Sequence, residues 1–125
     1  MEKVDKLQNG SGIQTEHEYW KQYRGLTKRY GLEVSGLYGY LLDKRGLSMK
    51  KTREGTHNFM DADGVYCIVS YDELETELNL TGYKIKKCKK ILRDIGLITE
   101  KRQMDGGNKI YVWDIPIWLD YKYGR

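Results

Sequence analysis

Two helix-start signals separated by a short turn constrain the fold of this chain more than any other feature of its sequence. Ser70 precedes Glu73 by three residues, which is the spacing of a capping box, and the helix that it starts is predicted to end near Leu78. Thr81 is a second N-cap candidate, and the longer helix that follows it is predicted over residues 82–95. Two helices joined by a turn of about three residues form a helix-turn-helix.

The chain before this pair is predicted to contain one longer helix and one hairpin. Residues 33–45 place apolar side chains on one helical face, and Gly46 is a plausible end for that helix. The polar residues 49–57 are predicted to form a loop. Residues 58–69 combine a turn sequence with strand formers, which predicts a hairpin. No element is predicted for the aromatic segment 13–32.

A second hairpin is predicted after the helix pair, from two β-like runs at residues 97–102 and 109–113 that flank an Asp-Gly-Gly-Asn turn. The order of helix, strand pair, short helix, turn, longer helix and hairpin is that of a winged helix-turn-helix, an α+β fold. We expect a flexible N-terminal tail at residues 1–12 and one domain at residues 13–125, with its wing at about 97–113.

The positive charge of the chain is concentrated in one segment. Residues 81–103 contain eight Lys or Arg and only two acidic residues, whereas the whole chain has a net charge of +4. The rest of the chain is therefore slightly acidic. A focused basic patch on a near-neutral body indicates a polyanionic partner.

The predicted helix at residues 82–95 has two opposed faces when its residues are projected at about 100° each. The apolar face consists of Ile85, Cys88, Ile91, Leu92 and Ile95. The opposite face consists of Tyr83, Lys86, Lys87, Lys90 and Arg93, with Lys89 at the edge and Lys84 in the first turn. Clustered lysines repel one another and oppose the helix dipole in the first turn, so the pattern favours a helix that meets phosphates. The alternative is an ordinary surface helix with a solvated lysine face.

The predicted wing carries Lys101 and Arg102 on one arm, with Asn108 and Lys109 near its tip. These residues suit contact with a nucleic-acid backbone. A plain two-stranded lid over the core is the alternative, because the apolar residues of the hairpin would serve that role equally well.

Lysine dominates this predicted interface. Because lysine is a point charge that suits phosphate, most of these residues are expected to set affinity, while Tyr83, Lys86 and Arg93 are candidates to read base edges. The full set of predicted DNA contacts is Thr81, Tyr83, Lys84, Lys86, Lys87, Lys90, Arg93, Lys101, Arg102, Asn108 and Lys109.

The sequence offers little support for an enzyme, a metal site or a membrane protein. It has no phosphate-binding loop, no G-x-S-x-G elbow and no His-x-x-x-His pair, and His17 and His57 stand alone. Cys67 and Cys88 are too far apart for a zinc cage and are expected to be buried thiols. Residues 1–12 lack the apolar stretch of a signal peptide, and no run is long enough to span a membrane. We therefore expect a cytoplasmic protein without catalytic activity, cofactor or metal.

Three stretches of the sequence together resemble a known family. Residues 36–48 (GLYGYLLDKRGLS) resemble a core helix that ends in LLDR..LS, and residues 61–74 (DADGVYCIVSYDEL) resemble the pattern DE.G.VY..Y..EEL. Residues 87–98 (KCKKILRDIGLI), 100–103 (EKRQ) and 108–112 (NKIYV) resemble K.L.ELE..GLI, a KRQ wing and an N.IYV return strand. The ordered set is similar to the N-terminal domain of RepA_N-type replication initiators from plasmids of Gram-positive bacteria.

The resemblance covers about residues 30–113 and implies a winged-helix domain that binds repeated sites at a plasmid origin, often as a dimer. It makes residues 82–95 the recognition helix. The sequence departs from the family at residues 50–57, which lack the pattern IKN.W, and at the wing tip, residues 104–107, which lacks GLNKP. Full-length initiators continue into a second, host-interacting domain, so the chain is expected to be a truncated initiator or a stand-alone relative.

Two other functions remain open from the sequence. A transcriptional regulator with the same fold would show the same features. A winged helix that binds other replication proteins would suit the eleven tyrosines together with Trp20, Trp113 and Trp118. Double-stranded DNA is the expected partner, and a homodimer through residues 13–46 and host replication proteins are further candidates.

Overall fold

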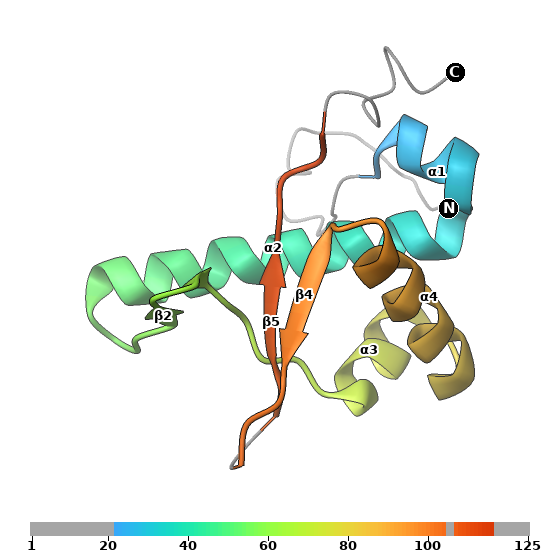
Figure 1. The fold of residues 1–125 in the computed structure, drawn as a ribbon. Coiled ribbons are helices and arrows are strands. Elements are labelled where there is room, and N and C mark those ends of the chain that lie inside the picture. The colour runs from blue at the N-terminus through green and yellow to red at the C-terminus, as the bar shows by residue number, and fades with distance from the viewer. Residues whose placement is uncertain (1–21, 105–106, 117–125) are drawn as a thin grey trace, which may run out of the picture.

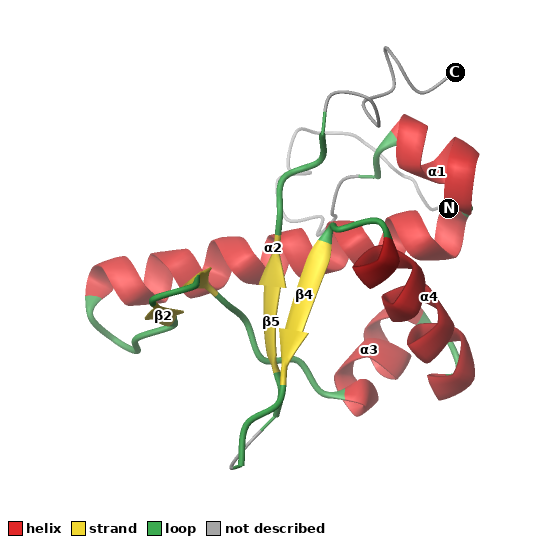
Figure 2. Cartoon of the chain, viewed as in Figure 1, coloured by secondary structure: helices red, strands yellow, loops and turns green. Residues whose placement is uncertain are grey.

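The computed structural model describes residues 22–104 and 107–116 of the chain. Its elements, in chain order, are α1 (Arg24–Tyr30), α2 (Leu32–Glu54), β2 (Met60–Asp61), β3 (Gly64–Val65), α3 (Tyr71–Leu78), α4 (Gly82–Asp94), β4 (Ile98–Lys101) and β5 (Lys109–Val112). Helix α2 runs across the molecule, α1 and α4 lie at its N-terminal end, and the β4–β5 hairpin crosses its middle (Figure 1). The strands form two short hairpins (Figure 2). The predicted tail at residues 1–12 lies outside the described residues.

Helix α2 is longer than its sequence predicts, and the predicted end at Gly46 is wrong. The helix continues through Gly46 to Glu54. It ends at Gly55, whose φ of 80° and ψ of 6° lie in the left-handed region that glycine adopts without strain. The loop predicted over residues 49–57 therefore begins only after residue 54.

Contacts with the chain that follows α2 support the helix on both sides of Gly46. A glycine inside a helix costs about 1 kcal/mol relative to alanine, which tertiary contacts readily offset. The Thr52 hydroxyl accepts a hydrogen bond from the Phe59 amide at 2.8 Å. Arg45 donates to the Val112 carbonyl at 2.8 Å, and Ser48 is buried. The chain after α2 therefore folds back along the helix that precedes it.

The segment 13–32, for which the sequence predicts no element, contains α1. Leu26 of this helix is fully buried, and the Tyr23 ring meets the Tyr38 ring edge-on, with 5.6 Å between the ring centroids. Gly31, with a φ of 100°, ends α1 and separates it from α2. A seven-residue helix without a side-chain cap gives only a weak local signal, because short helices depend on tertiary packing.

The predicted helix-turn-helix is present, with both of its caps. The Ser70 hydroxyl accepts a hydrogen bond from the Glu73 amide at 3.0 Å, and the Thr81 hydroxyl accepts one from the Lys84 amide at 3.2 Å. Asn79 turns the chain between the helices with φ of 54°, a left-handed conformation that asparagine tolerates well. The caps fix where α3 and α4 begin.

The Glu73 side chain is directed toward α2 and not toward the Ser70 amide that a complete capping box requires. Its carboxylate accepts a hydrogen bond from the Tyr40 hydroxyl and pairs with Lys44 at 2.8 Å. Burial raises the pKa of Glu73, but the hydrogen bonds from Lys44 and Tyr40 outweigh burial and hold this pKa below its usual value. This cluster holds α3 against α2.

Both predicted hairpins form, and an isolated backbone bridge links the wing to the segment that follows β3. β2 pairs with β3, and β4 pairs with β5 in an antiparallel register that places Ile98 opposite Val112. Cys67 exchanges two backbone hydrogen bonds with Ile110, each 2.9 Å long. The wing is therefore attached along β5 to the strand-like segment that leads into the helix-turn-helix.

The core lies between α2, the helix-turn-helix and the inner side of the wing. Its fully buried side chains are Leu26, Leu37, Tyr38, Leu41, Leu74, Ile85, Leu92, Leu97, Ile110, Tyr111 and Val112. The Tyr38 hydroxyl donates to the Trp113 carbonyl at 2.5 Å, which satisfies a polar group inside this core.

The two cysteines are buried free thiols, as the sequence predicts. Burial raises the pKa of Cys67 to about 11 and also raises that of Cys88. Among the described residues there is no group of three or more His, Cys, Asp or Glu side chains that could hold a metal ion. Within the same residues, none of the helices has the length and apolar character needed to cross a bilayer.

Candidate nucleic-acid interface

Helix α4 has one buried face and one exposed face, as its sequence predicts. Ile85 and Leu92 have no exposed surface, and Cys88 is 4% exposed. On the other side Tyr83 is 77% exposed. The remaining exposed residues of this cationic face are Lys86, Lys87, Lys90 and Arg93. Packing of the buried face fixes the rotation of α4 about its axis, so the cationic face points to solvent.

The cations of this face differ in their acidic neighbours. Lys86 and Lys87 form no ion pair with any residue that the structure describes. Lys90 pairs with Asp94, one turn further along α4, at 2.9 Å, and both side chains are more than half exposed. An exposed pair of this kind is worth at most about 1 kcal/mol, so Lys90 can exchange Asp94 for a phosphate.

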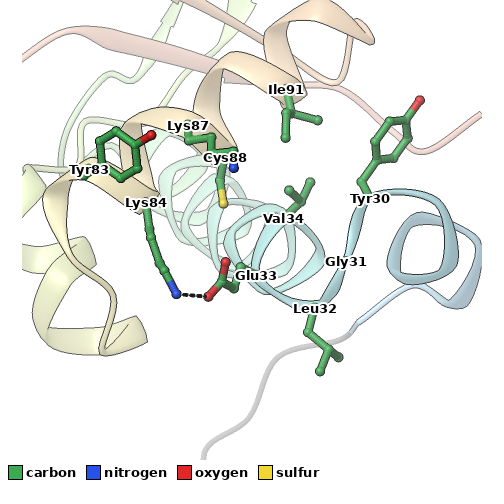
Figure 3. A pocket seen from close by; sticks show the side chains of 10 residues that line it. All are labelled: Tyr30, Gly31, Leu32, Glu33, Val34, Tyr83, Lys84, Lys87, Cys88 and Ile91. Atoms are coloured by element: carbon green, nitrogen blue, oxygen red, sulfur yellow. Dashed lines mark hydrogen bonds and ion pairs between the residues drawn. The ribbon is translucent and has the colours of Figure 1, made fainter.

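Thr81 and Lys84 lie at the start of α4, and each has a structural partner. The Thr81 hydroxyl caps the helix. Lys84 Nζ contacts Glu33 Oε2 of α2 at 2.9 Å, and this hydrogen bond holds the pKa of Lys84 above its usual value. The pair lies at a hollow of about 530 Å³ between α4 and the start of α2, which Tyr83 and Lys87 also line (Figure 3).

Lys89, predicted at the edge between the two faces, is buried. Its side chain is 4% exposed, and its Nζ pairs with Glu100 Oε2 at 2.8 Å. The same Nζ lies 4.8 Å from the centroid of the Tyr71 ring, at the start of α3. Lys89 therefore belongs to the packing between the helices and the wing, and it is not available to a ligand.

The wing cations lie against the acidic turn of the β2–β3 hairpin. Lys109 Nζ pairs with Asp61 at 2.8 Å, and Lys101 pairs with Asp63. Asp61 also accepts a hydrogen bond from the Tyr111 hydroxyl at 2.6 Å. The hydrogen bonds from Lys109 and Tyr111 hold the pKa of Asp61 well below its usual range, and the bond to Asp61 raises the pKa of Lys109.

The two other wing residues of the predicted interface have different surroundings. Arg102 is exposed at the end of β4 and forms no ion pair within the described residues. Asn108 donates from Nδ2 to Glu100 Oε2 at 3.2 Å. The structure thus brings the predicted wing residues to one hairpin, but only Arg102 projects without an acidic or polar partner.

Five acidic residues, none of which the sequence assigns to the interface, pair with its predicted cations: Glu33, Asp61, Asp63, Asp94 and Glu100. The sequence assigns Asp61 and Asp63 to a turn and gives Glu100 no role. The Lys90–Asp94 pair follows from i, i+4 spacing within one helix. The other contacts depend on how α2, α4 and the two hairpins pack together, which no spacing within the sequence reports. For Glu33, Asp61 and Asp63 the slightly acidic character of the chain before residue 81 is a signal, but it does not single out these positions.

A helix-turn-helix followed by a β-hairpin wing, with an exposed cationic face on the second helix, defines the winged-helix class of domains. Residues 20–123 match the family model described as "Replication initiator protein A (RepA) N-terminus". The chain therefore belongs to the RepA_N family, as the sequence resemblance indicates. No match is found among curated proteins.

Solved structures share this fold over nearly the whole chain. A structure described as "N-Terminal domain of DNA binding protein" has a TM-score of 0.68 and 24% identity, and the match covers 93% of this chain and 92% of that one. For "Structure of Rep-DNA complex" the values are 0.67 and 23%, over 92% and 91%. For "Structure of MDR initiator" they are 0.67 and 24%, over 93% of each chain. These likenesses confirm the predicted winged-helix fold.

Proposed function

We propose that this domain binds double-stranded DNA with sequence preference, at repeated sites of a plasmid replication origin. The observation that carries the proposal is the cationic face of α4, on which Lys86 and Lys87 have no acidic partner among the described residues. Membership of the RepA_N family supports a role in replication initiation. A structure of the same fold, described as a Rep–DNA complex, supports DNA as the ligand.

Helix α4 has the dimensions for the major groove. Its 13 residues span about 20 Å, and a helix with its side chains fits a groove about 12 Å wide. In this arrangement Lys87 and Lys90 contact phosphates, and Tyr83 and Arg93 reach base edges. Lys86 reaches both a phosphate and a base edge. The wing, through Arg102, Lys101 and Lys109, lies along the backbone.

The proposal includes the nature of the protein and its partners. The domain acts as a binding module in the cytoplasm, without catalytic activity and without a bound cofactor. A second copy of the chain and host replication proteins are its proposed protein partners.

The test is selection of duplexes from a random pool by the wild-type chain, followed by fluorescence-anisotropy titrations at several salt concentrations. We expect an enriched duplex that binds more tightly than a permuted duplex of the same composition. If about five phosphates are contacted, the logarithm of the binding constant should fall with the logarithm of salt with a slope of about −4 to −5. A slope near zero, or no binding at low salt, would contradict the proposal.

Charge reversal locates the interface. Lys86→Glu with Lys90→Glu should abolish binding of the enriched duplex, because it turns two phosphate contacts into repulsions. The matched control is Lys28→Glu with Lys50→Glu, which makes the same charge change at exposed lysines of α1 and α2. If the α4 variant binds like the control, α4 is a solvated face, and a protein-interaction role is favoured. If the enriched sequence occurs in promoters and not in origin repeats, a transcriptional regulator is favoured.

A further inference from the structure

One carboxylate joins the wing to α4. Glu100, on β4, receives Lys89 Nζ at 2.8 Å and Asn108 Nδ2 at 3.2 Å on its Oε2 atom. Its Oε1 atom receives Arg93 NH1 at 3.2 Å. Lys89 and Arg93 belong to α4, and Asn108 immediately precedes β5. Both oxygens of Glu100 are thus bonded, and the donors come from the helix and from the opposite arm of the wing.

The centre of this cluster is removed from solvent. The Glu100 side chain is 14% exposed and that of Lys89 is 4% exposed, and Lys89 also faces the Tyr71 ring of α3. Burial raises the pKa of Glu100, but the hydrogen bond and charge of Lys89, with Asn108 and Arg93, bring the pKa below its usual value. Glu100 is therefore ionised at neutral pH, and the cluster persists there as a charged unit.

A buried ion pair contributes little net stability compared with an apolar pair of similar volume, but its hydrogen bonds are directional. Apolar contacts between β4 and α4 would allow the hairpin to slide or tilt on the helix. Three donors on one carboxylate restrict the tilt relative to α4, while separate contacts with Asp61, Asp63 and Cys67 hold the wing against the β2–β3 segment. The bonds to this carboxylate also hold two residues of the predicted interface, Arg93 on the helix and Asn108 at the wing.

We propose that Glu100 is a positioning residue that sets the angle of the wing on α4 and presents Arg93 and Asn108 to DNA at a fixed separation. This inference rests on the proposed function. The duplex sets the distance between its major groove and the adjacent backbone, so α4 and the wing can both make contact only if their separation matches that distance. With a misplaced wing, α4 and the wing could not both fit the duplex. Arg93 on α4 would then lose its base contact before the lysines lost their phosphate contacts, which tolerate small displacements of a flexible side chain.

The variant that tests this role is Glu100→Gln combined with Lys89→Met. Replacing Glu100 alone would leave Lys89 buried without a counter-charge and could unfold the domain. The double variant removes both charges and keeps similar side-chain volumes. The matched control is Glu73→Gln with Lys44→Met, which removes another part-buried ion pair, between α3 and α2, away from the predicted interface.

Two measurements separate the positioning role from general stability and from the proposed function. Residual dipolar couplings of the free chain report the angle between β4–β5 and α4. Anisotropy titrations give the ratio of affinities for the duplex enriched by the wild type and for its permuted counterpart. We expect the double variant to change the angle and to lower the ratio about tenfold, as for loss of one base contact. The control should keep the wild-type angle and ratio.

An unchanged wing angle in the double variant, or an equal loss of the affinity ratio in the control, would overturn the positioning role. A wild-type chain that binds no duplex would contradict the proposed function, and the angle in the free chain would still decide whether Glu100 sets the wing. A changed angle together with an unchanged affinity ratio would overturn the link between Glu100 and DNA recognition.

Discussion

The cations of α4 and those of the wing are chemically alike but electrostatically different. On α4, Lys86 and Lys87 extend into solvent without an acidic partner among the described residues. On the wing, Lys101 and Lys109 each pair with an aspartate of the β2–β3 hairpin. A count of basic residues treats these two regions as equivalent, whereas within the described residues two exposed lysines of α4 are free and both wing lysines are paired. The division is not complete, because Lys84, Lys90 and Arg93 of α4 also have acidic partners and Arg102 of the wing has none.

The difference determines what each region can contribute to binding a polyanion. When a free lysine binds a phosphate, counterions are released from the DNA, and no ion pair within the protein has to be broken first. A paired lysine must first leave its aspartate, and the aspartate then repels the same phosphate. We therefore expect α4 to dominate affinity and salt dependence, with the wing adding a smaller contribution.

The largest effect is expected from removing the free charges of α4. Lys86→Ala with Lys87→Ala should reduce the magnitude of the salt slope by about two and weaken binding tenfold or more, because each lysine is proposed to make about one phosphate contact. Titrations of the enriched and permuted duplexes at several salt concentrations measure both quantities. Lys28→Ala with Lys50→Ala is the control, and an equal loss in that variant would remove any special role for α4.

A smaller effect is expected from removing one complete pair of the wing. Lys101→Ala with Asp63→Asn deletes both partners, so no unpaired aspartate is left beside the DNA. Binding should weaken only about threefold, and to the same extent for both duplexes, if the wing contacts the backbone as proposed. A loss as large as that of the α4 variant, or a loss confined to the enriched duplex, would break the proposed division between the regions.

Removing the acidic partner alone should strengthen binding. Asp63→Asn frees Lys101 and deletes a negative charge next to the wing, so affinity for both duplexes should rise about twofold, with a steeper salt slope. The same titrations check this. An unchanged slope would show that Lys101 does not reach a phosphate even when it is free.

The smallest effect concerns the stability of the free domain at low pH. Because the pKa of Asp61 is lower in the folded chain than in the unfolded chain, its contacts stabilise the fold above the unfolded value of about 3.9. This contribution is lost as the pH falls below that value. The difference in Tm between wild type and Asp61→Asn should therefore be constant near neutral pH and shrink below about pH 4. A difference in Tm that persists at lower pH would show that the stabilisation does not depend on the ionised carboxylate of Asp61.

The sequence predicts the features that depend on neighbouring residues. The caps at Ser70 and Thr81 and the two faces of α4 follow from spacing within one element, and the structure contains all of them. The winged-helix fold follows from their order. The extension of α2 past Gly46 does not, because it is supported by a hairpin that folds back onto the helix.

Most of what the sequence leaves undetermined at the candidate site lies in pairs of residues distant in the chain. Asp61 and Lys109 are 48 residues apart, and Lys101 and Asp63 are 38 apart. Their approach depends on the relative placement of two hairpins, for which no local pattern exists. Helical projection places Lys89 at the edge of the apolar face, but only the position of Glu100 explains why it is buried.

The reciprocal bonds between Cys67 and Ile110 have a consequence for the conformational entropy of the wing. Because β5 is bonded on one side to β4 and on the other to the segment leading into α3, its base cannot leave the domain without breaking both sets of bonds. Amide hydrogens at the base should exchange only when the whole domain opens. The base of the wing is therefore ordered during folding, and a ligand that meets the wing does not have to supply the free energy of ordering it.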